Sequence, residues 1–242
     1  MNRPSVNWIK RYYESEHYFL WYSQQGYFDE TWEEVDFIVA QTIQSGKVLD
    51  IGCGQGRHCL EFAKRGFEVV GIDISRKLIR QAKQAGKELL ARFIIDDARR
   101  MSRVKGCFDL AVLLFSSFGL HSHADNCLVI RETCAHLKTG GYLLIDADNV
   151  HEIIRYVANT RGVHTDGNFT ERIILDSAMN VVQWSESWRG QVYSGKYQLY
   201  TSKQLSRMLE DSGLQAKRLF GSFQGEEYST KSRRLIIVAV KP

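Results

Sequence analysis

The glycine-rich stretch VLDIGCGQG, at residues 48–56, decides the fold of this chain. It lies between a short apolar run and a segment with helical spacing, and a second apolar run, VVGID, ends at Asp73. This order predicts a glycine turn and a carboxylate at the tips of two neighbouring parallel strands. A crevice of that kind binds a nucleoside-bearing cofactor, with the ribose diol on the carboxylate.

The spacing of the glycines also indicates which cofactor binds. The dinucleotide fingerprint GxGxxG needs a third glycine where this chain has Arg57. The chain instead has GxGxG, preceded by Asp50. This pattern resembles the first motif of class I S-adenosylmethionine-dependent methyltransferases. S-adenosyl-L-methionine is therefore the expected cofactor, and S-adenosyl-L-homocysteine the expected product.

Five positions near the motif are expected to bind this cofactor. Gly52, Gly54 and Gly56 let the backbone turn sharply and approach the ligand. The N-terminus of the following helix favours the methionine carboxylate, and Asp50 would serve the amino group directly or through water. Asp73 can accept both ribose hydroxyls, because a carboxylate has two oxygens. The alternatives are a plain glycine turn in an unrelated α/β protein and an exposed strand-end acid.

The resemblance implies further cofactor contacts. In the family, an acid at the end of the third strand accepts from the exocyclic amine of adenine, and Asp97 aligns with that role. The backbone N–H of Ala98 would then meet a ring nitrogen, and Ile74 would lie against one face of the ring. Cys53 in the glycine loop and Phe115 after the fourth strand are also expected to face the cofactor.

The bulk composition is that of an ordinary globular protein. Its 242 residues are 44% hydrophobic and 25% charged, which is enough for a substantial core. No apolar run reaches the roughly 20 residues of a membrane span, and the N-terminus lacks the apolar part of a signal peptide. No membrane partner and a cytoplasmic location are expected. The five cysteines form no CxxC pair or zinc-like spacing, so no metal is expected.

Beyond the glycine loop, apolar strands alternate with helices, which predicts a parallel sheet with helices on both faces. The expected strands are residues 47–51, 67–72, 92–96, 109–114, 141–146, 214–221 and 235–240. The expected helices are residues 31–44, 56–65, 75–90, 123–137, 150–158 and 202–212. Thr31 with Glu34, Ser75, and Thr201 are expected to cap three of these helices.

The pattern changes after about residue 162, where alternating residues predict about three antiparallel strands with turns at Gly190 and at Ser194–Gly195. We therefore expect an α/β, Rossmann-like three-layer sandwich with a mostly parallel seven-stranded sheet. It would form a methyltransferase domain at 45–242, with a small antiparallel β insertion at about 165–200. Residues 1–44 would be an N-terminal helical lid or packing segment. The resemblance implies that the last strand is antiparallel.

Later runs extend the resemblance to one bacterial group of small-molecule class I methyltransferases. They include LLFSSFG at 113–119, LYTSKQL at 199–205 and the segment 221–239. The resemblance covers most of residues 28–242. It implies in-line transfer of a methyl group to nitrogen, oxygen or carbon of a small-molecule acceptor, and it leaves the acceptor open.

The N-terminal segment near residues 5–28 is rich in aromatic residues. The acceptor pocket is expected between this segment, the loop at 115–121 and the β insertion. Insertions beyond the carboxyl ends of the strands commonly form the walls of such sites. The expected acceptor-binding residues are Trp21, Tyr22, Ser116, Tyr228 and Arg233. The alternative for the N-terminal aromatic rings is a packing role. At least one of Arg233 and Arg234 could bind an acceptor carboxylate or phosphate. The alternative is that both arginines are surface residues or salt-bridge partners.

Two histidines after the fourth strand, His121 and His123, are the candidates for a catalytic base. A base is needed only if the acceptor must lose a proton, and both residues have a surface-loop alternative. Cys53 is rejected as a nucleophile, because methyl transfer from a sulfonium needs no covalent enzyme intermediate.

Two other functional classes remain open. An RNA- or protein-directed methyltransferase would show a contiguous basic face, but the net charge is only +4 and an Asn-Pro-Pro-Tyr motif is absent from the sequence. No nucleic-acid partner is therefore expected. A non-catalytic S-adenosylmethionine- or NAD-binding module is disfavoured by the intact cofactor acids and by Arg57. The oligomeric state stays open.

Overall fold

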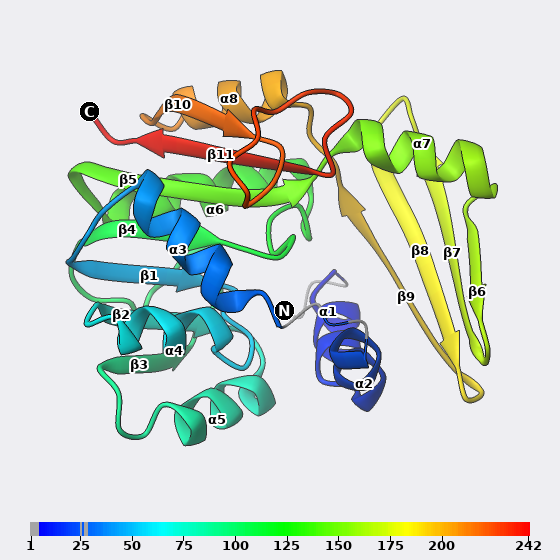
Figure 1. Ribbon diagram of the computed structural model, residues 1–242, viewed down its shortest axis with the longest axis horizontal. Helices are drawn as coiled ribbons and strands as arrows, with labels where there is room; N and C mark the ends of the chain where they lie inside the picture. The colour runs from blue at the N-terminus through cyan, green and yellow to red at the C-terminus, as the bar shows by residue number, and fades with distance from the viewer. Residues whose placement is uncertain (1–4, 25, 27–28) are drawn as a thin grey trace.

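The computed structural model describes residues 5–24, 26 and 29–242, without the side chains of residues 5–7 and 21. Its main part is a seven-stranded sheet of order β10-β11-β5-β4-β1-β2-β3 (Figure 1). The strands are β1 (Lys47–Ile51), β2 (Glu68–Asp73), β3 (Ala91–Ile95), β4 (Phe108–Leu113), β5 (Leu137–Asp148), β10 (Gln215–Phe220) and β11 (Arg234–Val240). Strands β1 to β5 pair in parallel, whereas β11 is antiparallel between β5 and β10. The predicted sheet and its antiparallel last strand are confirmed.

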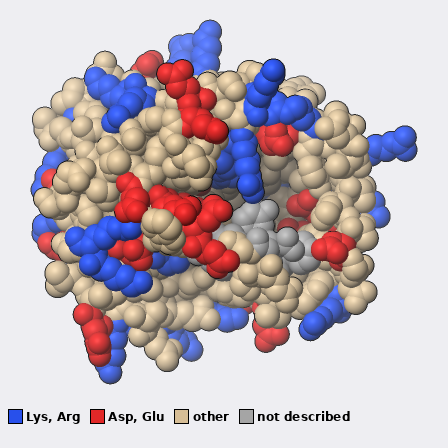
Figure 2. Space-filling model, in the orientation of Figure 1, with Lys and Arg blue, Asp and Glu red and all other residues tan. Residues whose placement is uncertain are grey.

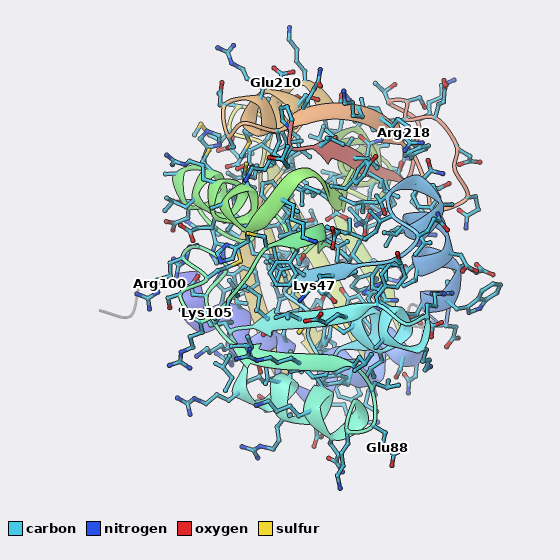
Figure 3. The ribbon with its side chains drawn as sticks, turned by 90° about the vertical axis from the view of Figure 1, so that its left-hand side faces the viewer. Lys47, Glu88, Arg100, Lys105, Glu210 and Arg218 are labelled. Carbon is cyan, nitrogen blue, oxygen red and sulfur yellow. The ribbon has the colours of Figure 1, made fainter. Side chains whose placement is uncertain are left out.

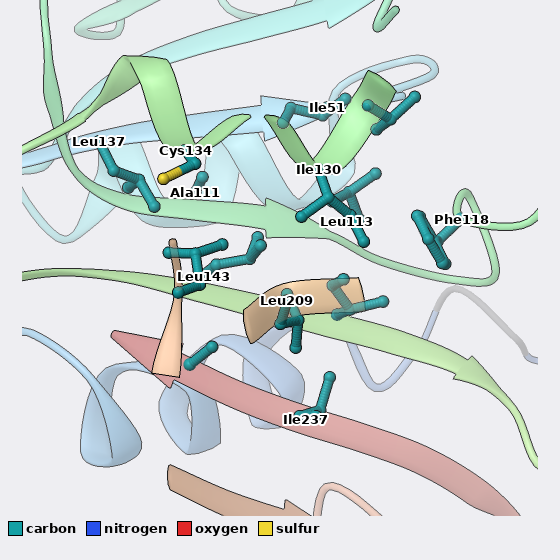
Figure 4. Close-up of a cluster of buried hydrophobic side chains, with 14 of the residues drawn as sticks. Ile51, Ala111, Leu113, Phe118, Ile130, Cys134, Leu137, Leu143, Leu209 and Ile237 are labelled. Atoms are coloured by element: carbon teal, nitrogen blue, oxygen red, sulfur yellow. The ribbon is translucent and has the colours of Figure 1, made fainter. Parts of the chain in front are cut away.

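Helices cover both faces of this sheet, because its central strands are apolar on both sides. One face carries α3 (Thr31–Gln41), α4 (Arg57–Lys64) and α5 (Arg76–Ala85), and the other carries α6 (His123–His136) and α8 (Ser202–Glu210). Figure 4 shows the second layer, where Ile130 of α6 and Leu209 of α8 lie against Leu113 and Leu143 of the sheet. The labelled charged side chains in Figure 3 point outward instead.

Side-chain caps fix where two of the predicted helices begin. The Ser75 hydroxyl accepts a hydrogen bond from the backbone N–H of Leu78 at the start of α5. Thr201 and Gln204 form the reciprocal capping box at the start of α8. Both predicted caps are confirmed.

The third predicted cap, a capping box of Thr31 and Glu34, is wrong. Helix α3 begins after Glu30, whose side chain makes no capping hydrogen bond. The Thr31 hydroxyl and the Glu34 carboxylate instead accept from the Arg57 guanidinium, at 2.8 and 2.5 Å. A long-range ion pair therefore competes successfully with the local cap, and it ties α3 to the helix that follows the glycine loop.

The predicted β insertion is a separate four-stranded antiparallel sheet rather than a three-stranded one. It consists of β6 (Val163–Asp166), β7 (Phe169–Asp176), β8 (Val181–Trp188) and β9 (Gln191–Gln198), covered by α7 (Val150–Thr160). The predicted turn at Ser194–Gly195 is also wrong, because both residues lie within β9. A Cβ atom on Gly195 would lie 2.5 Å from the Trp8 ring, so this glycine allows a helix to approach the strand closely.

The two N-terminal helices, α1 (Ser5–Tyr13) and α2 (Glu16–Gln24), lie between the carboxyl ends of the parallel strands and the second sheet (Figure 1). Trp8 packs edge-to-face on Trp184 of β8, with ring centroids 5.6 Å apart. On the other side, the Ser75 hydroxyl and the Lys77 ammonium both hydrogen-bond to Glu14. These helices therefore bridge the two sheets. Over the part of the chain described, no helix has the length and hydropathy to cross a membrane.

Candidate active site

Two cavities meet at the carboxyl ends of the parallel strands. The first, of about 130 Å³, is lined by the glycine loop, the end of β2 and the loops after β3 and β4. The second, of about 520 Å³, lies between α1, α2, α7 and the second sheet. Among the described residues, four line both cavities: Tyr13, Tyr18, Phe115 and Leu120. The cavities therefore adjoin at these side chains.

The glycine loop turns under the first cavity with left-handed backbone angles. The backbone φ is +79° at Gly52, +56° at Gly54 and +86° at Gly56. A Cβ atom on Gly54 would meet nothing within 4 Å, so this backbone faces open space. Gly56 does not line the cavity, and a Cβ atom there would lie 2.8 Å from the Phe93 ring. Gly54 thus leaves room for a ligand, whereas Gly56 leaves room for the core.

Asp73 ends β2 beside this loop, and its carboxylate is held by two backbone amides. The N–H groups of Gly54 and Ser75 donate to its two oxygens, at 3.0 and 2.7 Å. Burial raises the pKa of Asp73 to about 6, although both hydrogen bonds favour the ionised form. Each oxygen keeps a lone pair, so the group can accept two further hydrogen bonds from one ligand.

Asp50 lies beneath the loop and is only 2% exposed. Burial raises the pKa of Asp50 to about 6, against the hydrogen bond that the Cys59 thiol donates at 3.1 Å. Burial likewise raises the pKa of the Cys53 thiol to about 11. The thiol is therefore protonated at neutral pH, in agreement with its rejection as a nucleophile. Asp50 and Cys53 both line the first cavity.

At the far side of the first cavity, Asp97 and Ala98 lie where the sequence placed them, together with Ile74. The Arg99 guanidinium donates to the Asp97 carboxylate at 2.6 Å and reaches Asp125 at 3.3 Å. Burial would raise the pKa of Asp97, but the hydrogen bonds and charge of Arg99 hold it below its usual value. Asp97 is thus a fixed anion at the cavity wall, and sequence reasoning missed its partner.

A buried network behind the glycine loop was also missed. The Glu34 carboxylate accepts from Arg57 at 2.5 Å and lies 2.7 Å from the His58 Nε2. Burial lowers the pKa of His58, and the neighbouring Arg57 charge lowers it further. The Arg57 guanidinium also lies 5.0 Å above the Phe115 ring. The first turn of α4 is therefore fixed to α3 and to the loop after β4.

Phe115 and Ser116 both have positive φ values, +53° and +56°, which is strained backbone for residues with side chains. The loop is held by Asp146, whose carboxylate accepts from the backbone N–H of Phe115 at 2.8 Å. Asp148 accepts from the Ser116 hydroxyl at 2.9 Å. Arg234 donates to both acids and to Ser116. These hydrogen bonds hold the strained loop, and with it the Phe115 ring, at the junction of the two cavities.

Arg234 is consequently not available to an acceptor. Burial would lower the pKa of its guanidinium, but Asp146 and Asp148 raise it above its ordinary value. Arg234 thus takes the salt-bridge role given as its alternative, although its side chain also lines the second cavity. Arg233 is exposed and lines the second cavity.

The predicted acceptor residues divide between the second cavity and other places. Tyr22, Ser116 and Arg233 line it. Tyr228 lines neither cavity, because its hydroxyl donates to the Asn149 side chain at 3.1 Å. The Trp21 side chain lies outside the described residues.

Neither predicted base lines the second cavity. His121 lines the first cavity, where burial and then the Arg99 charge lower its pKa. The His123 ring lines neither cavity, and its Nδ1 lies 3.3 Å from the Tyr200 hydroxyl. Whether either histidine acts as a base therefore stays a prediction. No metal-ligating cluster of His, Cys, Asp and Glu is found among the described residues.

The comparisons agree with this geometry. Residues 48–141 match the methyltransferase domain family. The methyltransferase-like protein YqeM of Bacillus subtilis is 26% identical over 225 residues, which is 85% of this chain and 88% of YqeM. The cypemycin N-terminal methyltransferase of a Streptomyces species is 25% identical over 206 residues, 79% of this chain and 81% of the relative.

A solved structure shows the same fold. CalS10, an amino pentose methyltransferase from Micromonospora echinaspora bound to S-adenosylmethionine, has a TM-score of 0.67 and 19% identity, covering 94% of this chain and 98% of that one. Together these matches support a class I S-adenosylmethionine-dependent methyltransferase, with its methyltransferase domain over residues 48–141. The GxGxG motif that indicated S-adenosyl-L-methionine lies near the start of this matched region.

Proposed function

We propose that this enzyme methylates a small-molecule acceptor, with the cofactor in the first cavity and the acceptor in the second. The observation that carries the proposal is the shared lining of the two cavities by Tyr13, Tyr18, Phe115 and Leu120. Two ligands can meet only where the cavities adjoin, so the methyl group passes at these residues. The acceptors in the names of cypemycin methyltransferase and CalS10 support a bound acceptor of this kind.

The residues of the first cavity fit the cofactor. The open space over Gly54 accommodates the methionine part, and the two lone pairs on Asp73 suit a vicinal diol. Asp50 would bind the amino group, directly or through water, while Cys53 and Gly52 line the loop. Ile74, Asp97 and Ala98 would enclose the adenine. Gly56 contributes through the turn it permits rather than by contact.

When bound, the cofactor supplies a methyl group made electrophilic by its sulfonium. The contribution of the chain is alignment, since in-line displacement depends on holding the reacting atoms collinear. Tyr13 and Tyr18 from the N-terminal helices close the junction from one side, and the strained Phe115 closes it from the other. No nucleophilic side chain of the enzyme is required.

We further propose that residues 1–44 act as a lid and that residues 45–242 form the methyltransferase domain, with its β insertion at about 165–200. Support comes from α1 and α2, which supply rings to both cavities. An RNA-directed activity is less well supported. In Figure 2 acidic side chains gather over α3, while basic side chains are spread around the rest of that face. A polyanion favours a contiguous basic face.

Calorimetry tests the proposal directly. S-adenosyl-L-homocysteine should bind in the micromolar range, with a free energy of about −8 kcal/mol, and NAD should give no heat. A crystal structure of that complex should place the sulfur beside Phe115, at the junction. Binding of NAD in place of S-adenosyl-L-homocysteine, or a sulfur position remote from the junction, would refute the arrangement.

A further inference from the structure

The second cavity carries more acidic than basic side chains. Its described charged lining residues are Asp148, Glu152, Glu171, Glu186, Arg233 and Arg234. Most of these charges already have partners. Arg234 binds Asp148, and Glu152 pairs with Arg155 on α7. Glu186 is 4% exposed, and its carboxylate is bound by the Tyr12 hydroxyl and by His17.

Glu171 is different, because its only hydrogen bond among the described residues comes from the Tyr156 hydroxyl, at 2.9 Å to Oε2. Its Oε1 has no hydrogen-bond donor among them. Glu171 lies on β7 with the cavity-lining Ile173, two residues along the same face. Its carboxylate therefore borders the cavity with one oxygen available.

The position of Glu171 is electrostatically unfavourable in the absence of a ligand. It lies directly opposite Glu186 in the β7–β8 pair and opposite His164 in the β6–β7 pair. Like charges directly opposite each other destabilise a sheet. Burial raises the pKa of Glu171, and the charges of Glu186 and Asp148 raise it further, against the Tyr156 hydrogen bond and the His164 charge, which lower it. A cation bound at Oε1 would remove this cost.

The rest of the lining suits a cation as well. Trp8, Tyr12, Tyr22, Trp184 and Tyr197 all line the cavity, and aromatic faces attract ammonium groups. The site also connects to the junction. Glu171 and Tyr197 line the same cavity as the junction residues Tyr13 and Tyr18.

We propose that the acceptor is a small alkyl amine, bound as an ammonium ion by the Oε1 oxygen of Glu171 within the aromatic lining. The inference rests on the proposed function and names its substrate class. After one proton leaves the ammonium for water, the nitrogen lone pair forms the new bond to the methyl carbon. The methyl–sulfur bond breaks with its electron pair on sulfur, and the N-methylated product forms directly as an ammonium cation that needs no further proton.

The experiment compares three probes of similar size that differ in charge: cyclohexylamine, cyclohexanol and cyclohexanecarboxylate. Saturation-transfer NMR measures their binding to the protein loaded with S-adenosyl-L-homocysteine, at up to about 10 mM probe. The amine should bind at least about tenfold more tightly than the other two. In steady-state assays the amine should be methylated and the alcohol should not.

Two variants assign the preference to Glu171. Glu171→Gln should abolish the preference for the amine and raise its KM about tenfold or more, with kcat changed less. Its melting temperature should stay level or rise, since a repulsion is removed, and Glu171→Asp should restore part of the preference. Glu152→Gln, in the same cavity but already paired with Arg155, should retain the preference within about threefold.

The outcomes separate the two proposals. If S-adenosyl-L-homocysteine binds but the alcohol or the carboxylate binds as well as the amine, the amine assignment is wrong and the proposed function survives. The same conclusion follows if the amine shows no binding at about 10 mM, or if Glu171→Gln keeps the preference. Preference for the carboxylate would instead identify exposed Arg233 as the main acceptor contact. Failure of S-adenosyl-L-homocysteine to bind removes both proposals.

Discussion

The two cavities are built in different ways. The cofactor cavity is lined mainly by residues at the ends of successive parallel strands and in the loops and helices that follow them, and α1 and α2 add Ile9, Lys10, Tyr13 and Tyr18. The acceptor cavity is formed by long side chains from α1, α2, α7 and the second sheet, which are far apart in the sequence. The first is a property of the sheet topology, whereas the second exists only when three separate segments pack together. Changes in the two cavities should therefore have separable effects.

The largest effect is expected at Gly54. Gly54→Val should abolish detectable binding of S-adenosyl-L-homocysteine, a loss of more than about 100-fold, because the side chain enters the space left for the cofactor. The variant should also be less stable, because a valine is strained at the backbone φ of +56° that Gly54 adopts. Gly167→Val is the matched control, with φ +55° and equally open surroundings in the turn between β6 and β7. Melting temperatures should fall by similar amounts in the two variants. Calorimetry should show that binding is lost only in Gly54→Val.

Asp73→Ala should have the next largest effect, weakening S-adenosyl-L-homocysteine by about 2–3 kcal/mol, because two charge-assisted hydrogen bonds to the ligand disappear. Asp109→Ala is the control, since Asp109 also accepts from a backbone N–H but lies at the opposite end of its strand and lines neither cavity. Equal affinity for the Asp73 variant and the parent, with earlier melting, would mean that Asp73 only supports the turn.

Glu186→Gln tests the acceptor cavity, which Glu186 lines. The change removes the negative charge opposite His17 and should destabilise folding by about 1–2 kcal/mol, lowering the melting temperature by about 3–6 °C. Affinity for S-adenosyl-L-homocysteine should stay within about twofold, since Glu186 does not line the first cavity. Glu68→Gln, which breaks an exposed pair with Lys47, should change the melting temperature by less than about 2 °C. A large loss of cofactor affinity in Glu186→Gln would show that the two cavities are coupled.

The difference between the cavities also explains what the sequence could predict. The glycine loop, Asp50 and Asp73 are close together in the sequence and follow strands with clear periodicity, so their placement beside one another followed from topology. The partners of Asp97 and His58 could not be assigned in this way, because side-chain geometry decides which of several nearby charges pair. The wrong capping box at Thr31 has the same cause.

The acceptor cavity was harder still, since its contacts join residues far apart in the sequence, such as Tyr12 and Glu186, which are 174 positions apart. A usable signal was nevertheless present in the insertion. Alternation along β7 and β8 places Glu171 and Glu186 on the same face as Ile173 and Trp184, which is unusual for acids. Tyr228 was assigned from sequence resemblance alone, and its hydrogen bond to Asn149 shows that it supports the start of α7 instead.

The smallest expected effect is a pH dependence confined to the cofactor cavity. The pKa values of Asp50 and Asp73 are raised to about 6, so both carboxylates are mostly ionised at pH 7.5 and about half protonated at pH 6. If the ligand binds their ionised forms, affinity for S-adenosyl-L-homocysteine should fall about two- to fourfold over that range. The unliganded fold should show the opposite trend, because a carboxyl group with a raised folded pKa binds protons more tightly when folded. Its contribution therefore favours folding at acidic pH and is lost as the pH rises towards 6.

Asp73→Asn gives this prediction its internal test. The variant should bind more weakly at every pH and keep only the part of the pH dependence that belongs to Asp50. Calorimetry at about pH 7.5, 6.75 and 6.0 follows a carboxyl group of pKa about 6 from mostly ionised to half protonated. This range is sufficient to separate the contributions of Asp50 and Asp73. An unchanged pH profile in Asp73→Asn would assign the titration to Asp50 or to another group, such as His121, whose lowered pKa places its protonation on the acidic side of 6.5. The cofactor cavity would then sense pH through one of these groups rather than through the carboxylate proposed to receive the ribose.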